Sequence, residues 1–552
     1  MAQPYSDGAQ ARGRVDATRL AALTLGAATV CLRLPRALSA SFWQDEVASA
    51  RVVQQETFGA MLHQVVRTES TPPLWYALAW ATHQFGVSIH DTRLLSVACD
   101  GILVAVVVLL AGRMLPPLLA ATAGVVAAVA PQLSAHGREL RAYELLALLV
   151  VVFALALERA VAQPEVRRLG PLATVTAAGL MTHYFFAFTI SAGVLWLAVE
   201  GRARTRVLLA LAAGVAVCAP WTPFFLRQYH ADRYSWIGPF SASEVLATPT
   251  HLLGSRFGTP LVVVWLGLAT GLAWRTGPRA RLVTLLALAP IGIASMVWAS
   301  GVRIYAARNL IGAAPFLVIL LIVPLVQLHG RLRVTAATLV AGALVAGYAA
   351  TQLRPDVPYR AIAQALVADG WHGADPIAVA GGLHALRSPL EWYLPDAPRF
   401  VHRLRLQHRN ELVYVVLGSR SGGRAVARDR IRIGNFLVGL LPAHDVRQRG
   451  PGRLTLFTPR PRPRPAATYA LTRHAVACDS SAPGVRPWAA SACWPLIRPV
   501  SAGPAIRVAL RGQMQLPATA GDIAVGHRAT NSIKFPVPAG SLHPGGHSAV
   551  HK

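Results

Sequence analysis

Charged residues are scarce in this chain of 552 residues, at 14%, whereas a soluble globular protein carries about 25%. This scarcity, together with 54% hydrophobic residues and a mean hydropathy of +0.43, excludes a set of ordinary soluble domains. Apolar stretches of about 17–25 residues recur between Leu20 and Ala350, and each is long enough to cross a bilayer. The composition therefore predicts a polytopic α-helical membrane protein.

Acidic residues are the scarcer charged class, with 25 Asp and Glu against 53 Lys and Arg, so the net charge is +28. A basic chain of this kind is one pattern of nucleic-acid binding. Here, however, much of the arginine lies in short loops between apolar stretches, where the positive-inside rule places it. The sequence therefore favours a membrane topology signal and predicts no nucleic-acid partner.

Cysteine is rare and lacks the spacing of a metal site. Cys31, Cys99 and Cys218 lie in apolar runs and are expected to be buried small hydrophobic residues. Cys478 and Cys493 lie in the C-terminal tail and can pair only if that tail is extracytoplasmic, which the sequence leaves open. An internal repeat and a Rossmann-type glycine motif are also lacking.

About eleven membrane spans are predicted from the apolar stretches. They cover residues 18–38, 93–113, 115–133, 141–160, 170–183, 186–200, 205–225, 258–274, 282–300, 309–328 and 333–350. These spans are almost free of charge at mid-depth, which argues against a transporter, whose ion and substrate sites need polar groups inside the membrane.

Every second loop between these spans is rich in arginine. The basic positions are Arg12, Arg14 and Arg19, then Arg113, then Arg159, Arg167 and Arg168, then Arg202, Arg204 and Arg206, then Arg275, Arg279 and Arg281, then Arg331 and Arg333. Because basic loops stay in the cytoplasm, the N-terminal residues 1–17 are expected inside the cell. With eleven spans, the C-terminal region is then expected outside the cell. The protein is expected in the plasma membrane.

The remaining loops hold acidic and aromatic residues, and the first of them, residues 39–92, holds the most. Asp45 and Glu46 follow the first span almost at once, and an adjacent acidic pair at a membrane surface suits a general base. The alternative is a pair of solvated acids that begin a surface helix. Residues from Val47 to Gln64 are expected to form a helix lying in the membrane interface, and Leu74 to Phe85 a second one that ends at Gly86.

The other outer loops carry basic and aromatic groups suited to phosphate. Arg138 and Arg141 are three residues apart and offer forked donors to a phosphate, and Arg303 and Arg308 add charge at the same leaflet. The alternative for these arginines is snorkelling to lipid headgroups. His183 in Thr182-His183-Tyr184-Phe185 is a candidate proton shuttle, phosphate donor or metal ligand, or else a packing residue.

Residues 351–458 are less apolar and are expected to form a small extracytoplasmic α/β domain. A helix is predicted over 359–368, and strands over 377–380, 412–417 and 454–457. From Pro459 to the end, proline, arginine, alanine, glycine and serine dominate, so residues 459–552 are expected to be mostly disordered.

Taken in order, several of these motifs resemble those of the GT-C glycosyltransferases, in the branch of the protein O-mannosyltransferases and the lipid A aminoarabinose transferase. They are Trp43-Gln44-Asp45-Glu46, Glu69 before Pro72-Pro73-Leu74-Trp75-Tyr76, Phe85-Gly86, Arg93-Leu94-Leu95-Ser96, Arg138-Glu139-Leu140-Arg141-Ala142-Tyr143, Thr182-His183-Tyr184-Phe185, and Tyr305-Ala306-Ala307-Arg308-Asn309 with Pro315. The resemblance covers roughly residues 18–350.

The resemblance implies an inverting transferase that moves a sugar, mannose or another hexose or pentose, from a polyprenyl-phosphate carrier. It implies Asp45 as the catalytic base with Glu46 beside it, and Glu69 as a residue for the acceptor or a divalent metal ion. Thr71 stands where many members have histidine, which puts a metal at that place in question. The donor phosphate is assigned to Arg138, Arg141, Arg303, Arg308 and Tyr184, with His183 for acceptor or metal.

The acceptor expected from this assignment is an extracytoplasmic protein, glycolipid or polysaccharide. Two other functions remain as alternatives: a transporter or lipid flippase, and a non-catalytic scaffold on a decayed transferase. Retention of Asp45, Glu46 and Glu69 together argues against the scaffold.

Overall fold

The computed structural model describes most of the chain up to Leu456. The described residues are 4–201, 205–254, 258–352, 357–368, 371–373, 376–380, 384–396, 399–400, 412–418, 431–433, 436–442, 446–448 and 454–456. The predicted tail 459–552, with Cys478 and Cys493, lies outside them.

A helix occupies each of the eleven predicted spans. The helices are α1 (Pro4–Ser39), α5 (Leu94–Ala111), α6 (Pro117–Val129), α8 (Tyr143–Ala162), α9 (Val166–Thr182), α10 (Phe186–Val199), α11 (Thr205–Val217), α14 (Thr259–Thr276), α15 (Pro278–Ala299), α16 (Ala314–Ile322) between η3 (Ala307–Ala313) and η4 (Val323–Gln327), and α17 (Gly330–Gln352). Within the described residues, seven helical segments are long and apolar enough to cross a membrane, and α6 and α10 are shorter apolar helices. The protein is thus a multi-pass membrane protein.

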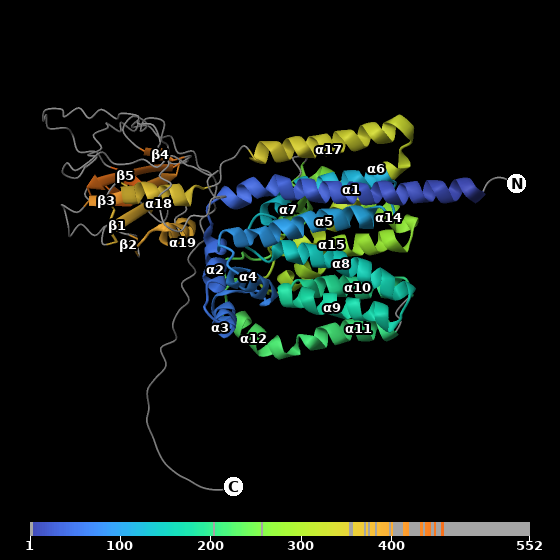
Figure 1. The fold of residues 1–552 in the computed structure, drawn as a ribbon, viewed down its shortest axis with the longest axis horizontal. Coiled ribbons are helices and arrows are strands. Elements are labelled where there is room, and N and C mark those ends of the chain that lie inside the picture. The colour runs from blue at the N-terminus through green and yellow to red at the C-terminus, as the bar shows by residue number, and fades with distance from the viewer. Residues whose placement is uncertain are drawn as a thin grey trace, which may run out of the picture.

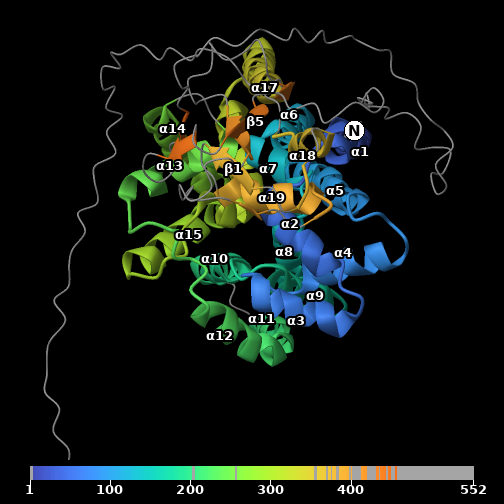
Figure 2. The same cartoon turned by 90° about the vertical axis from the view of Figure 1, so that its left-hand side faces the viewer.

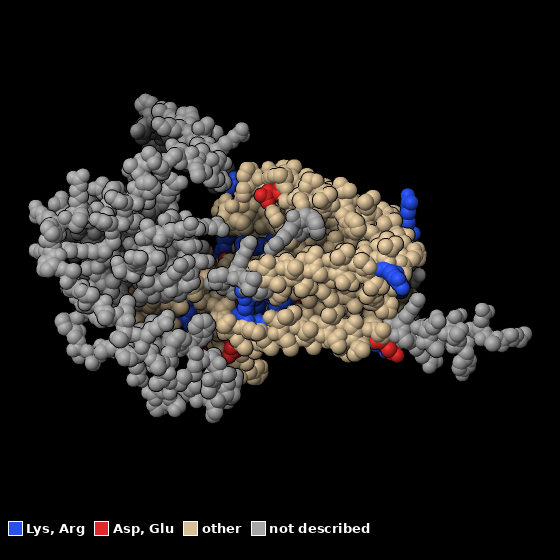
Figure 3. Space-filling view, turned by 90° about the horizontal axis from the view of Figure 1, so that it is seen from above, with Lys and Arg blue, Asp and Glu red and all other residues tan. Residues whose placement is uncertain are grey.

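The long helices lie side by side as one bundle, and shorter elements cover one of its ends (Figure 1). These short elements are α2 (Gln44–Val53), α3 (Phe58–Thr68), α4 (Leu74–Gln84), η1 (Asp91–Arg93), α7 (Pro131–His136), η2 (Ala219–Trp221), α12 (Thr222–His230) and α13 (Ala242–Leu253). In the end-on view, α2, α3, α4 and α12 lie in front of the bundle (Figure 2). Blue and red side chains appear mainly at the two ends of the bundle and its middle is almost uncharged, as expected for a surface in contact with lipid (Figure 3).

Helices α1 and α5 cross closely because two glycines face each other. A Cβ atom on Gly26 would lie 2.8 Å from the carbonyl oxygen of Gly101, and one on Gly101 would lie 3.0 Å from that of Gly26. Small residues allow membrane helices to approach in this way, and the gain is van der Waals contact between backbones. This contact fixes the position of α1 against α5.

Charged residues do lie inside the predicted spans, toward their outer ends rather than at mid-depth. Arg33 of α1 donates from Nε to Oδ2 of Asp100 on α5 at 2.6 Å, and both side chains are at most 1% exposed. Glu144 in the first turn of α8 is fully buried and lies beside Asp100. The sequence pattern missed these residues because single charges in long apolar windows barely change mean hydropathy.

The first outer loop folds as three short helices rather than as one long interfacial helix followed by another. The predicted helix from Val47 to Gln64 is interrupted after Val53, and α3 starts anew where the Thr57 hydroxyl accepts the Ala60 N–H at 3.1 Å. That hydrogen bond is the N-cap of α3, and it pairs a backbone N–H that the start of a helix would otherwise leave without a partner. Helix α4 ends at Gln84, two residues before Gly86 with φ 87°, as predicted.

The segment after α17 includes helices α18 (Tyr359–Ala368) and α19 (His384–Tyr393) and seven short strands. The strands are β1 (Pro376–Ala380), β2 (Arg399–Phe400), β3 (Leu412–Gly418), β4 (Ile431–Ile433), β5 (Phe436–Pro442), β6 (Val446–Gln448) and β7 (Leu454–Leu456). Five of them form a sheet in the order β2-β1-β3-β5-β4, in which β1 runs parallel to β2 and β3, and β5 runs antiparallel to β3. Strands therefore lie at all three predicted positions, and α18 matches the predicted helix.

Helix α19 rests on the loop that leads into α2. The Tyr393 hydroxyl accepts the Phe42 N–H at 2.7 Å, and the Trp392 ring packs edge-on against the Phe42 ring. Arg360 donates its backbone N–H to the Ser41 hydroxyl at 3.0 Å. These contacts hold the backbone immediately before Asp45 and Glu46 from the side away from the bundle.

Candidate active site

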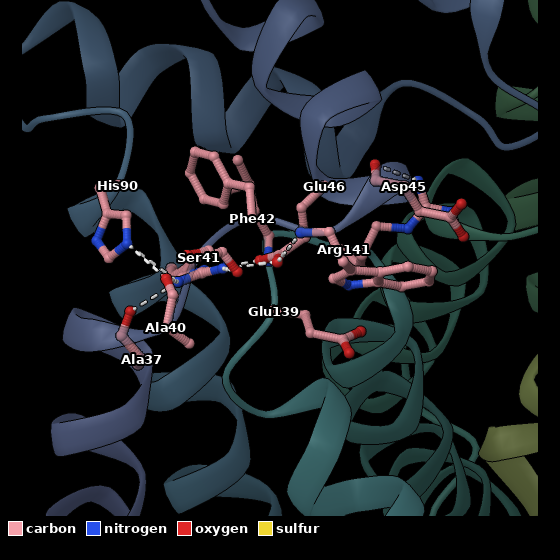
Figure 4. Close-up of polar contacts among 12 residues, drawn as sticks. Ala37, Ala40, Ser41, Phe42, Asp45, Glu46, His90, Glu139 and Arg141 are labelled. Carbon is pink, nitrogen blue, oxygen red and sulfur yellow. Dashed lines mark hydrogen bonds and ion pairs between the residues drawn. The ribbon is translucent and has the colours of Figure 1, made fainter. Parts of the chain in front are cut away.

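Two adjacent acids at the start of α2 point in different directions (Figure 4). Helix α2 begins at Gln44 after the extended residue Trp43, which places Asp45 and Glu46 in its first turn. Acidic side chains are favourable there because the helix dipole is positive at its N-terminus. The sequence left open whether these acids are solvated, and the structure shows 23% exposure for the Asp45 side chain and 1% for Glu46.

Asp45 faces two arginines from distant loops. Its Oδ2 lies 3.1 Å from Nη1 of Arg308 on η3 and 3.8 Å from Nη2 of Arg141, which precedes α8. Arg141 also donates to the Asp45 carbonyl and to the Ser49 hydroxyl, each at 3.3 Å. An acid of the first loop thus meets an arginine of the second loop and an arginine of the last one.

Glu69 completes this group from the far end of α3. Its Oε2 lies 3.3 Å from Nη1 of Arg141 and accepts the Tyr76 hydroxyl at 2.6 Å. Burial, and then the nearby Glu69 carboxylate, raise the pKa of Tyr76 well above its usual value, so the phenol stays protonated and donates. Arg141 therefore joins Asp45 and Glu69, two acids that are 24 residues apart in the sequence.

Both arginines retain a donor for a further group. Among the described residues, the buried Nε atoms of Arg141 and Arg308 have no hydrogen-bond partner. The Arg308 guanidinium stacks 4.8 Å from the Trp236 ring centre, and Arg141 lies 5.6 Å from that of Tyr143. Buried N–H groups are almost always paired, so these two unpaired donors are exceptions within the described part of the chain.

Glu46 is bound in a separate, fully buried network. Arg93 donates from Nε to Oε1 at 2.7 Å and from Nη2 to Oε2 at 2.6 Å, and the Leu140 N–H donates to Oε1 at 2.8 Å. Arg93 also donates to the carbonyls of Ala37, Ala40 and Ser41 at the end of α1. This forked pair ties α1, α2, η1 and the loop before α8 together, directly behind Asp45.

His183 follows the last residue of α9 and is 4% exposed. Burial, then the charges of Arg141 and Arg308, lower the pKa of His183 to about 3, so its ring is neutral near pH 7. The Phe185 N–H donates to Nδ1 at 3.2 Å, which leaves the ring hydrogen on Nε2. His183 lies in the field of the same two arginines, as a neutral hydrogen-bond donor.

Tyr184 belongs to a supporting network that the sequence did not predict. Its hydroxyl donates to Gln228 of α12 at 2.5 Å and accepts the Trp221 indole N–H at 2.9 Å. Gln228 donates in turn to the carbonyls of Val65 and Thr71 at 3.1 and 3.3 Å. Tyr184 therefore positions the backbone around Glu69.

Arg303 lies apart from the group around Asp45. It is exposed and donates to the Ser235 carbonyl at 3.4 Å, so it contacts the segment 231–241 between α12 and α13. Arg138 precedes Glu139, whose carboxylate lies 2.8 Å from Nδ1 of His136. Arg141 of the same loop contacts both Asp45 and Glu69.

A metal site does not emerge from the described part of the chain, where His, Cys, Asp and Glu form no group of three that could hold an ion. Glu69, the candidate ligand, is already occupied by Tyr76 and Arg141. The residues around it therefore fit an ion pair better than a cation.

Acidification should lower the stability of the fold through His183. In the folded state its pKa is about 3, against an ordinary value of 6.5, so the folded protein binds fewer protons than the unfolded chain between these pH values. Stability is therefore lost as the pH falls below about 6.5, by about 2 kcal/mol at pH 5. His183→Gln should reduce the drop in melting temperature between pH 7.5 and 5, and the exposed His63→Gln should not. Equal drops in both variants would contradict the assignment.

Comparisons with known proteins bear on the same region. Residues 70–224 match the family model described as Dolichyl-phosphate-mannose-protein mannosyltransferase. The resemblance to the GT-C glycosyltransferases is thereby confirmed. The matched segment includes Arg93, Arg141 and His183, and it begins after Glu69, so Asp45 and Glu46 lie before it.

Two solved structures are similar to this chain. One is ArnT from Cupriavidus metallidurans in the apo state, with 13% identity and a TM-score of 0.49, covering 78% of this chain and 98% of that one. The other is the same protein bound to undecaprenyl phosphate, with 14% identity and a TM-score of 0.46, covering 76% and 97%. The search of curated proteins finds no match.

Sequence reasoning missed several residues that build the site. Arg93 belongs to one of the motifs above, but the sequence assigns it no function. A signal was present, because an arginine at the start of an apolar span needs an acidic or polar partner. Arg233 donates to the carbonyls of Val66, at 3.1 Å, and of Arg67 and Glu69, and so caps the end of α3. This contact spans more than 160 residues of sequence and had no local signal.

Proposed function

We propose that this protein is an inverting membrane glycosyltransferase that moves a sugar from a polyprenyl-phosphate carrier to an acceptor hydroxyl at the outer face of the membrane. The observation that carries the proposal is Asp45, an accessible carboxylate held beside two guanidinium groups with orphan buried donors. The confirmed family resemblance supports the same reaction class.

The chemistry follows from the residue types at the site. Asp45 accepts the proton of the acceptor hydroxyl as its oxygen attacks C1 of the sugar. The bond from C1 to the phosphate oxygen breaks on the opposite side, and the lipid phosphate leaves with the electron pair. Arg141 and Arg308 stabilise the growing negative charge on the phosphate. Stabilisation by such preorganised donors is usually the largest single contribution to catalysis. Glu69 and Tyr76 hold Arg141 in place.

Topology is part of the proposal. The N-terminal residues 1–17 lie in the cytoplasm, residues 18–350 form the transferase with eleven spans and the catalytic loop 39–92, and the α/β region 351–458 lies outside. The contacts of Tyr393 and Arg360 with the loop before α2 support this arrangement, because they place α18 and α19 at the same end as Asp45. The acceptor is an extracytoplasmic protein, glycolipid or polysaccharide.

The buried charges inside the helices bear on the alternative function, a transporter. Arg33 and Asp100, however, are paired at 2.6 Å and closed off from solvent, and Arg33 also donates to Tyr348 at 3.0 Å. A transport pathway needs polar groups that line a water-filled cavity. The cluster therefore favours helix packing.

The test of the proposed reaction uses the purified full-length protein. It is incubated with a panel of polyprenyl-phosphate sugars and cell-envelope acceptors, and products are identified by mass. Transfer from one donor with release of polyprenyl phosphate supports the proposal. Flux of a solute or lipid across vesicle membranes, with no transfer from any donor, would support the transporter instead.

Arg308 and Arg303 should differ in their effect on transfer. Arg308→Gln removes one guanidinium from Asp45 and from the expected phosphate position, and the loss of a charge-assisted hydrogen bond lowers kcat/KM by about 10- to 100-fold. Arg303→Gln is the matched control, because Arg303 contacts only a loop carbonyl in the described residues and should change kcat/KM by less than about threefold. Steady-state kinetics with varied donor measures both, and equal losses would remove Arg308 from the proposed site.

A further inference from the structure

A cavity lies at the end of the bundle opposite to Asp45. Its volume is about 390 Å³, and it is lined by residues from the ends of α5 and α8, from α10 and η4, and from the junction between α14 and α15. None of the residues proposed for transfer lines it. The cavity is therefore separate from the candidate active site and has its own chemistry.

The polar side of the cavity holds two cations and one anion. Nη1 of Arg113 lies 2.5 Å from Oε2 of Glu158, and Nε of Arg279 contacts Oε1 of the same carboxylate. Arg279 is 56% exposed, Arg113 29% and Glu158 12%. One carboxylate facing two guanidiniums leaves a net charge of +1 in the cavity. Each guanidinium has five N–H donors and uses one on Glu158, so both can bind a phosphate without releasing it.

The cavity also has an apolar lining. It includes Leu115, Val161, Val323 and Trp196. The Trp196 indole donates to the Pro278 carbonyl at 2.8 Å, so its polar atom is satisfied and its ring is available for packing. Trp274, in the last turn of α14 beside this junction, is exposed, as aromatic residues are at the level of lipid headgroups. A ligand that matches this cavity has a phosphate at one end and hydrocarbon at the other.

We propose that this cavity binds the phosphate headgroup of an anionic membrane phospholipid, between Arg113 and Arg279, with an acyl chain against the apolar wall. Basic pockets between membrane helices bind lipid headgroups by the same combination of charge and hydrocarbon contact. The lipid would lie at the junction between α14 and α15. Gly277 at that junction has φ 132°, a backbone conformation outside the helical region. The lipid would thus stabilise the bundle at a point where a helix pair turns.

Glu158 makes the proposal sharply testable because it competes with the ligand. If the cavity binds an anion, Glu158→Gln frees both arginines and strengthens binding about tenfold, while Arg113→Gln with Arg279→Gln weakens it about tenfold or more. If the three residues only brace the helices, both changes weaken the protein and neither strengthens binding. Arg275→Gln is the matched control, because Arg275 is exposed in the last turn of α14, close to Arg279 in the sequence, but does not line the cavity.

The experiment uses full-length protein stripped of lipid in detergent. Phosphatidylglycerol is titrated and its dissociation constant is read from the rise in melting temperature, with native mass spectrometry to count bound lipids. The expected order of affinity is Glu158→Gln above wild type and Arg275→Gln, with the double arginine variant last. Phosphatidylglycerol should bind more tightly than phosphatidylcholine.

Three results would overturn the proposal. The first is an unchanged affinity in the double arginine variant. The second is a Glu158→Gln variant that binds phosphatidylglycerol more weakly than wild type. The third is an equal stabilisation by inorganic phosphate alone, which would make the site one for a free anion rather than for a lipid.

Discussion

Asp45→Asn lowers kcat for sugar transfer by about 10²- to 10⁴-fold, the range of a lost general base, while the protein stays folded in the membrane. The amide fills the same space and still accepts a hydrogen bond from Arg308, so the local geometry is preserved. The proton of the acceptor hydroxyl then has no carboxylate to receive it. Because Arg141 and Arg308 remain, the KM for the polyprenyl-phosphate donor changes only a few fold.

The matched control for Asp45 is Glu56→Gln. Glu56 is an exposed acid of the same outer loop, between α2 and α3, so the change also removes one negative charge from that surface. It should leave kcat within about twofold, as a surface substitution away from the chemistry does. A fully active Asp45→Asn enzyme would remove Asp45 from the reaction, and a control as inactive as Asp45→Asn would point to surface charge instead.

Glu46→Ala destabilises the protein by about 3–5 kcal/mol, because it leaves the Arg93 guanidinium buried without its counter-charge. The same reasoning predicts a rescue. Glu46→Met combined with Arg93→Met removes both charges, and such a double replacement of a buried pair is often neutral or stabilising. Thermal unfolding of Glu46→Met, Arg93→Met and the double methionine variant in detergent gives the coupling between the two residues.

The exposed pair of Arg51 and Glu391 serves as the control for Glu46. Their charged atoms lie 3.4 Å apart and both side chains are 45% exposed, so Arg51→Ala should change stability by less than about 1 kcal/mol. Glu46→Ala and Arg51→Ala with equal effects would show that the Glu46 network does not hold the fold together. A double methionine variant less stable than either single one would show that the pair supplies more than charge balance.

These two predictions separate the roles of neighbouring acids. The sequence assigned Asp45 and Glu46 jointly to catalysis. We propose instead that Glu46 positions the loop, because each of its oxygens is held by Arg93 and it is 1% exposed. Asp45, one residue earlier, keeps 23% exposure and faces Arg308. On a helix, adjacent side chains point about 100° apart, so one can enter the protein while the other enters the site.

Local patterns were sufficient for much of the fold. The eleven helices lie where apolar runs of membrane length occur, and α4 ends where Gly86 allows a positive φ. Seven of these helical segments are long and apolar enough to cross a membrane by themselves. The other four are α6, α9 and α10, which have 13, 17 and 14 residues, and α14, which has 18. Ends of helices, and hence the number of crossings, depend on packing as well as on hydropathy.

What the sequence by itself determined was the class of the protein, the positions of its helices, and the set of polar loops from which the site is drawn, because hydropathy and charge act residue by residue. What only the tertiary structure decided was which members of that set meet. Arg308 reaches Asp45 across 263 residues, whereas Arg303, only five positions earlier, holds a loop carbonyl instead. Glu46 becomes buried because Arg93 and the Leu140 N–H close over it from other elements. Such pairings depend on how separate helices pack, and no local pattern carries that information.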